Sequence, residues 1–221
     1  MNLRVTCILQ SAIANDVPML DAIIEGEMAH RLGKGASIQR DKPAPPYGEI
    51  PVPYLRATFA GLSIPCCSSP ILATAAESVE HFGKRLATEH SALLSPNKRQ
   101  MAPMTNGVFK SYRIPLRLRD CGRIVWFIRG ERREVRKILQ NVHSLGKKRS
   151  FGYGRVKEWL VENVEQDLSW FAKTDRGTIL MRPLPKCDDL PADLIGFREE
   201  FGAAQSPYWH PDRFIERVVP C

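Results

Sequence analysis

A ten-residue segment over residues 146–155 combines three glycines, four cations and two aromatic rings. Glycine lets a sugar-phosphate backbone approach closely, lysine and arginine neutralise phosphates, and each ring can stack on an unpaired base for about 1–3 kcal/mol. We therefore predict an RNA-binding loop; the alternative is a tight turn that carries solubilising charges. The residues expected to bind are Gly146, Lys147, Lys148, Arg149, Phe151, Gly152, Tyr153, Gly154 and Arg155.

The elements around this segment exclude two common phosphate-binding motifs. The segment follows an expected helix and precedes an expected strand, whereas the glycine fingerprint of Rossmann domains follows a strand and opens a helix. A Walker A loop ends in Gly-Lys-Ser or Gly-Lys-Thr, and the segment has no such ending. We therefore expect no cofactor.

The charge of the chain is concentrated around the same segment. The net charge is +8; residues 98–157 hold 17 Lys or Arg against three acids, and the rest of the chain carries −6. Such segregation is the footprint of a polyanion binder, and a solvated basic face without a partner is the alternative. Further candidate RNA contacts in this block are Lys98, Arg99, Lys110, Tyr112 and Arg113.

The histidines give little support for catalysis. Metal-free RNA cleavage needs a base, an acid and a cation for the phosphate. His30, near the end of the first expected helix, is the best candidate, but its helical neighbours Gly26 and Glu27 make no dyad. His143 could orient the loop or touch RNA. We expect His81 and His90 to be solvated and His210 to pack or cap.

The acids and cysteines suggest no metal centre. The acids are dispersed and form no DxD, HD or paired-carboxylate cluster, so we expect a non-catalytic protein without metal. Without a CxxC pair or a visible export signal, we expect reduced thiols in a cytoplasmic protein, and no apolar run approaches the ~20 residues of a membrane helix. The six cysteines are Cys7, Cys66, Cys67, Cys121, Cys187 and Cys221.

Hydrophobic periodicity and turn residues predict the elements that hold the loop. In chain order we expect a strand over 3–14, a helix over 17–32 with Asp16 as N-cap, a strand over 54–59, a helix over 77–94 and a strand over 108–118. A strand over 123–128, a helix over 131–145 ended by Gly146 and a strand over 155–164 follow. Two strand–helix–strand units predict an α+β protein with a ferredoxin-like, RRM-like core.

The prolines locate the irregular parts of the chain. Seven prolines fall between residues 43 and 70, and the last third of the chain is again rich in proline. We expect a core over 1–165 with insertions at about 34–70 and 95–106. A C-terminal extension over 166–221 is expected to pack on the core as an irregular wrap, with a short helix over 192–201.

The glycine loop lies between a basic helix and the strand Val-Lys-Glu-Trp-Leu-Val-Glu, and in this setting it resembles the loop of the RAMP superfamily of CRISPR-associated proteins. Five further stretches narrow the resemblance to the RAMP subunit of type IV CRISPR effectors that holds the 5′ handle of the guide RNA. They are Met19-Leu-Asp-Ala-Ile-Ile24, Gly107-Val-Phe-Lys-Ser-Tyr-Arg-Ile-Pro115, Met181-Arg-Pro-Leu-Pro185, Ser206-Pro-Tyr-Trp-His210 and Pro220-Cys221.

The resemblance implies a non-catalytic, prokaryotic RNA-binding subunit that takes part in defence against foreign DNA. Such a protein grips the crRNA 5′ handle, caps the filament of backbone subunits, contacts the large subunit and meets target DNA near the adjacent motif. Two alternatives stay open: a metal-independent, repeat-processing endoribonuclease of the same superfamily, and an RRM-like RNA-binding regulator unrelated to CRISPR. The aromatic RNP pattern that would favour the regulator is absent.

The two rings of the loop are expected to have different roles. In an extended segment, Phe151 and Tyr153 point to opposite sides. We predict that Phe151 is buried against the helix over 131–145 and that Tyr153 faces the RNA, because its hydroxyl tolerates water.

Overall fold

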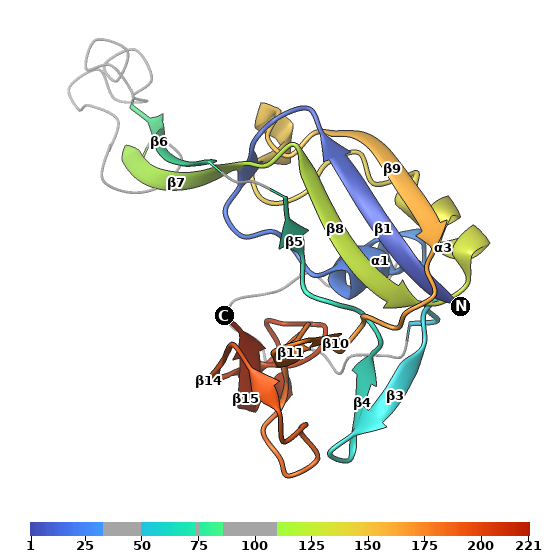
Figure 1. Cartoon of the computed structure of the whole chain (residues 1–221). Helices are drawn as coiled ribbons and strands as arrows, with labels where there is room; N and C mark the ends of the chain where they lie inside the picture. The colour runs from blue at the N-terminus through green and yellow to red at the C-terminus, as the bar shows by residue number, and fades with distance from the viewer. Residues whose placement is uncertain (33–49, 74–75, 86–109) are drawn as a thin grey trace, which may run out of the picture.

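A computed structural model describes residues 1–32, 50–73, 76–85 and 110–221. These residues form an α+β structure that is mostly β-sheet, with α1 (Leu20–Arg31) and α3 (Arg132–Leu139) as its α-helices (Figure 1). Within the described ranges, neither helix has the length and apolar character needed to cross a membrane.

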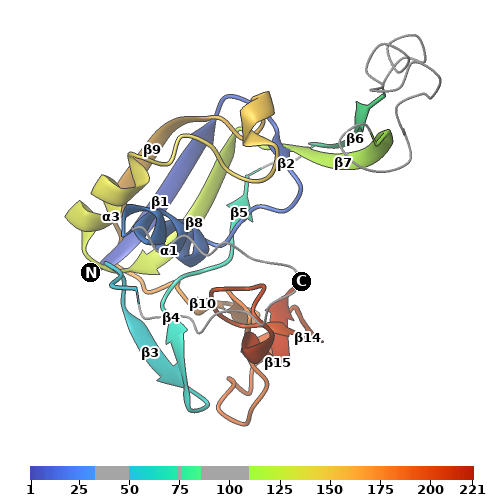
Figure 2. The ribbon, with the colours of Figure 1, turned by 180° about the vertical axis from the view of Figure 1, so that it is seen from behind.

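A four-stranded sheet forms the centre of the molecule. Its strand order is β5-β8-β1-β9, and every neighbouring pair is antiparallel. Its strands are β1 (Asn2–Leu9), β5 (Ile71–Leu72), β8 (Arg123–Arg129) and β9 (Val156–Asn163). Figures 1 and 2 show both helices on one face of this sheet. The predicted strands at 123–128 and 155–164 and the predicted first helix are thus confirmed, and the strand over 3–14 is confirmed up to Leu9.

The main core lies between the sheet and the two helices. Val5 pairs with Trp126 on one side and with Val161 on the other, and all three are buried. From α1 and α3, Ile24 and Val135 reach the same cluster. The β-branched and aromatic composition that predicted central strands therefore describes one buried face of the sheet.

A long hairpin leaves the body of the protein next to this sheet. β6 (Ala76–Lys84) and β7 (Tyr112–Asp120) form it, and β2 (Ile13–Ala14) pairs with the base of β7. Figure 1 shows this β6–β7 arm extending away from the sheet. The helix expected over 77–94 is wrong for residues 77–84, because β7 pairs with all nine residues of β6. Its remainder from residue 86, like the expected insertion over 95–106, lies outside the described residues.

Helix α3 is shorter than its hydrophobic stripe predicted. It ends at Leu139, yet Val142 and Leu145 still pack against the core from a non-helical segment. The chain leaves the helix early because Ser144 forms a β-bridge with Arg155 beyond the loop. Consequently Gly146 is not the residue that ends the helix. Asp16 is not the N-cap of α1 either: that position is Met19, without a side-chain cap.

The C-terminal residues form β-sheets, whereas the sequence predicted an irregular wrap. Gly196, with φ +64°, separates β13 (Leu194–Ile195) from β14 (Phe197–Ala203). The helix expected over 192–201 is therefore wrong, because β14 pairs along its whole length with β15 (Phe214–Pro220). Other elements here are β10 (Phe171–Thr174), β11 (Gly177–Leu180), β12 (Leu184–Pro185) and the 3₁₀ turn η3 (Pro211–Arg213). The hairpin β3 (Arg56–Phe59) and β4 (Leu62–Pro65) contributes Phe59 and Ile64 to the core of these sheets.

A buried arginine ties the C-terminal sheets to α1. Arg182 is fully buried, and its Nη1 donates hydrogen bonds of 2.6 Å to Pro65 O and 2.8 Å to Cys67 O. Its Nη2 lies 3.6 Å from the carboxylate of buried Asp21, which accepts a 2.8 Å hydrogen bond from the Tyr208 hydroxyl. Burial raises the pKa of Asp21, and the Arg182 charge opposes that rise. The three side chains come from three of the stretches on which the family resemblance was based.

Candidate nucleic-acid interface

The glycine loop, residues 146–155, is a compact knob between α3 and β9. Its centre is a 3₁₀ turn, η2 (Arg149–Phe151), and a residue with positive φ lies at each end: Lys148 at 56° and Gly152 at 90°. The loop is therefore not extended, and side chains within it do not alternate between two faces.

Two of the three glycines are required by close packing. A Cβ on Gly146 would lie 2.7 Å from the Ile13 side chain, and a Cβ on Gly154 would lie 2.0 Å from Leu145 O. Gly152 also has a positive φ, but nothing lies within 4 Å of the position that a Cβ would occupy there, so it faces open space. Of the three, only Gly152 thus leaves room for a ligand backbone to approach.

A strap that follows β1 and includes β2, residues 10–14, holds the loop in place. Ser11 Oγ donates to Gly152 O at 2.7 Å and accepts from Arg155 N at 2.9 Å. Gly154 N donates to Ala12 O at 2.8 Å. The sequence reasoning missed Ser11, because a lone serine after a strand carries no signal until the loop is placed beside it.

The cations of the loop are available to bind an anion. Lys147, Arg149 and Arg155 are exposed and Lys148 is half-buried. None of these four forms an ion pair with a carboxylate among the residues that the structure describes. The loop thus combines a backbone fixed by hydrogen bonds with four cations that have no carboxylate partner in the described residues.

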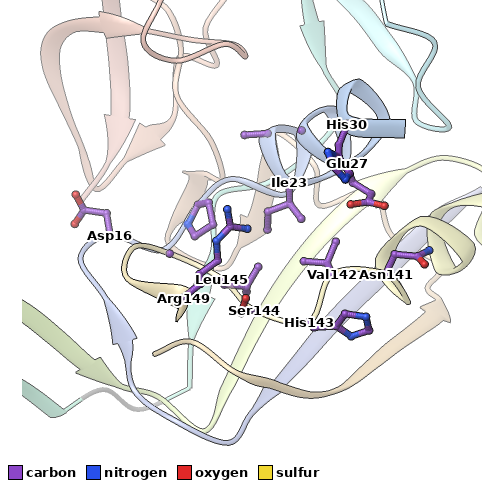
Figure 3. Close-up of a pocket in the computed structure, with 14 residues that line it drawn as sticks. Asp16, Ile23, Glu27, His30, Asn141, Val142, His143, Ser144, Leu145 and Arg149 are labelled. Atoms are coloured by element: carbon purple, nitrogen blue, oxygen red, sulfur yellow. The ribbon is translucent and has the colours of Figure 1, made fainter. Parts of the chain in front are cut away.

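A groove of about 660 Å³ separates the loop from α1. Glu27 and His30 line it from α1, and His143 and Arg149 line it from the opposite side (Figure 3). Sequence reasoning found no partner for His30, and the structure brings His143 to the same groove. In Figure 3, however, the His143 ring is turned away from α1.

The predicted orientation of the two loop rings is wrong. Phe151 is 61% exposed and does not pack on α3, whereas Tyr153 is half-buried against Ala14, Leu116 and Leu118. The Tyr153 hydroxyl donates a 2.6 Å hydrogen bond to Glu80 on β6. This bond favours the protonated phenol and raises the pKa of Tyr153. The reversal arises because the β6–β7 arm covers Tyr153, and the sequence predicted a helix where β6 lies.

Three of the other predicted RNA contacts lie on β7 or just before it. Tyr112 and Arg113 lie at the far end of β7, and Lys110 is exposed just before it. Lys98 and Arg99 lie outside the described residues. The structure therefore brings Tyr112 and Arg113 onto the same arm that covers the glycine loop.

A second basic surface lies on α3. Arg133, Arg136 and Lys137 line a groove of about 640 Å³ together with Met1 and Asn163. On this helix Val135, Ile138 and Leu139 are buried, and the cations lie on its exposed faces.

A family model for the CRISPR type IV associated protein Csf3 matches residues 73–220, about two thirds of the chain. The chain belongs to the Csf3 family. The type IV CRISPR part of the resemblance is thereby confirmed. The matched residues of this Csf3-family protein contain the β6–β7 arm, the glycine loop and the C-terminal sheets, whereas α1 and the strap precede them. No curated protein matches the chain.

His210, His81 and the cysteines of this Csf3-family protein were also given roles by the sequence, whereas His90 lies outside the described residues. His210 Nδ1 accepts from Asp212 N at 3.3 Å and so caps η3, as predicted, and His81 is exposed on β6. All six cysteines are free, and burial raises the pKa of Cys7 to about 12. Over the described ranges, no group of three or more His, Cys, Asp or Glu could hold a metal ion.

Proposed function

We propose that this Csf3-family protein is a non-catalytic, RNA-binding subunit of a type IV CRISPR ribonucleoprotein. In this role the glycine loop holds the crRNA 5′ handle, and the subunit caps the filament of backbone subunits during defence against foreign DNA. The observation that carries the proposal is the set of four unpaired cations on a loop whose backbone is fixed by the strap over residues 10–14.

The arrangement of the central sheet supports a RAMP, ferredoxin-like core. A helix follows β1, another follows β8, and the antiparallel order β5-β8-β1-β9 places the two strand–helix–strand units side by side. Both helices cover one face of the sheet, as Figure 2 shows. The loop that precedes β9 then lies at the edge of this core, beside α1.

The chemistry of the loop supports a single-stranded nucleic acid as the ligand. Lys147, Arg149 and Arg155 are spaced along a knob, a form suited to several successive phosphates rather than one deep nucleotide pocket. The basic groove on α3 supports a second contact, which we assign to the target DNA or to guide RNA beyond the handle. The backbone and large subunits of the complex are the protein partners in this proposal.

The first test measures RNA binding as a function of salt. In fluorescence anisotropy with single-stranded handle RNA, Lys147→Ala/Arg149→Ala should lower the magnitude of the slope of log K against log salt by about 1.4, since each contact contributes about 0.7. The matched control is Lys173→Ala/Arg176→Ala, which removes one exposed lysine and one exposed arginine from the β10–β11 hairpin. An unchanged slope in the loop variant, or an equal change in the control, would place the RNA elsewhere.

A second test identifies the RNA. Protein isolated with its complex should carry small RNAs that share one 5′ sequence, because handle binding selects a common end. The loop variant should lose these RNAs, and the control variant should keep them. A heterogeneous RNA population in the unmodified protein would contradict handle binding.

The groove between α1 and the loop favours a second candidate, a metal-independent endoribonuclease. It places His30, His143 and Arg149 around one cavity, and these residue types can supply a base, an acid and a phosphate contact. Incubation with repeat RNA in the presence of a chelator decides between the two functions. Binding without cleavage is the result expected here; cleavage that His30→Ala or His143→Ala abolishes would establish the enzyme.

A further inference from the structure

Three aromatic rings from distant parts of the sequence are in contact, and one of them belongs to the glycine loop. The centroids of Phe82, on β6, and Phe151, in the loop, are 4.7 Å apart, with the rings nearly perpendicular at 79°. Tyr112, on β7, stacks on Phe82 with a centroid distance of 6.0 Å and an interplanar angle of 28°. The arm and the loop therefore share one aromatic surface.

Along the arm, the hydrophobic side chains change from buried near its base to half-buried or exposed at the three rings. Leu116 and Leu118, nearer the base of β7, are buried with Ala14. Farther out, Tyr112 is 37% exposed and Phe151 is 61% exposed. Large rings that stay exposed next to a completed core are typical of a surface that binds something.

A lysine is built into the same surface. Lys148 Nζ lies 3.7 Å from the centroid of the Phe82 ring and 5.8 Å from that of Phe151. These distances are typical of cation–π contacts. The cation thus lies against the Phe82 ring, whereas the Tyr112 and Phe151 rings remain exposed to solvent.

The charge around the rings favours a polyanion over an apolar protein segment. Lys147, Arg149 and Arg113 are exposed close by in the chain, without a carboxylate partner among the described residues. Glu80 is the acid of β6 on the same face as Phe82, and its carboxylate already accepts the hydrogen bond from Tyr153. Rings for bases and cations for phosphates are the combination by which proteins bind single strands.

We propose that Tyr112 and Phe151, which both pack on Phe82, form a stacking site for unpaired bases of the bound RNA, directly beside the phosphate-binding cations of the glycine loop. The inference rests on the proposed RNA binding and adds a role for the β6–β7 arm, which contacts bases while the loop contacts phosphates. Stacking of this kind tolerates any base, because every base has a π-face.

The test removes ring faces while keeping apolar volume. Tyr112→Leu/Phe151→Leu should weaken binding of single-stranded handle RNA about 5- to 140-fold, the equivalent of one lost stacked base. The fluorescence of 2-aminopurine placed in the RNA should be quenched by the unmodified protein and not by the variant. The control is Phe201→Leu, which alters a ring that is 70% exposed on β14, far from the arm in sequence, and should change neither signal.

Abasic RNA completes the test. The unmodified protein and Tyr112→Leu/Phe151→Leu should bind an abasic handle equally, because stacking no longer contributes. If the ring variant binds intact RNA as tightly as the unmodified protein while Lys147→Ala/Arg149→Ala binds weakly, the stacking site is refuted and RNA binding stands. If neither variant weakens binding, the proposed function fails as well. Normal RNA binding with lost assembly into the complex would show that the rings contact a protein, which also refutes the site.

Discussion

Arg182 and Arg149 show how differently two parts of this molecule use the same side chain. Arg182 is fully buried and donates to Pro65 O, Cys67 O and Ala204 O. Arg149 is exposed on the glycine loop and has no carboxylate partner among the described residues. One guanidinium holds the C-terminal sheets to α1, and the other remains exposed to solvent. Positive charge alone therefore does not distinguish a structural arginine from an exposed one; burial and internal hydrogen-bond partners do.

The largest effect expected from this contrast is on folding. Arg182→Met should lower the free energy of unfolding by about 3–5 kcal/mol, because it leaves the Asp21 carboxylate buried without its cation. Arg149→Met should stay within about 0.5 kcal/mol of the unmodified protein, as is usual for surface positions. Urea denaturation measures both, and equal stabilities for the two variants would show that the buried cluster does not hold the sheets together.

A smaller effect is expected within the glycine loop itself. Gly152→Ala places a side chain in open space at φ 90° and should cost about 1–2 kcal/mol of stability from backbone strain. Gly154→Ala has the same kind of strain and in addition a 2.0 Å approach to Leu145 O, so it should be the more destabilising of the two. Urea denaturation compares them. The reverse order would mean that the contact between the loop and the segment before it is loose.

The smallest effect concerns the contact between the arm and the loop. Tyr153→Phe removes the hydrogen bond to Glu80 and should cost about 0.5–1.5 kcal/mol of stability near neutral pH. The pKa of Tyr153 is raised in the folded state above its usual value of 10.0, so this stabilisation is present below pH 10 and is lost as the pH rises through the folded-state value. Unfolding measured across that range should show a larger loss in the unmodified protein than in Tyr153→Phe, which keeps the contributions of the buried Tyr54 and Tyr208.

The sequence by itself was sufficient for the features that depend on neighbours along the chain. The strand at 123–128 follows from its β-branched and aromatic residues, and the stripe of α3 follows from helical periodicity. The segregation of charge could also be predicted from the sequence. The same holds for the glycines of the loop, because positive φ and close packing favour glycine. These features, with the quoted stretches, led to the type IV CRISPR family that the comparison confirmed.

Only the tertiary structure decided which distant segments meet. β6 is a strand because β7 pairs with it, although its own residues are almost all exposed and give no burial pattern to read. The same arm reversed the expected burial of Phe151 and Tyr153, and the end of α3 at Leu139 brought His143 to the groove that holds His30. In each case the deciding hydrogen bonds and contacts come from residues outside the segment itself, so its local sequence preference does not predict them.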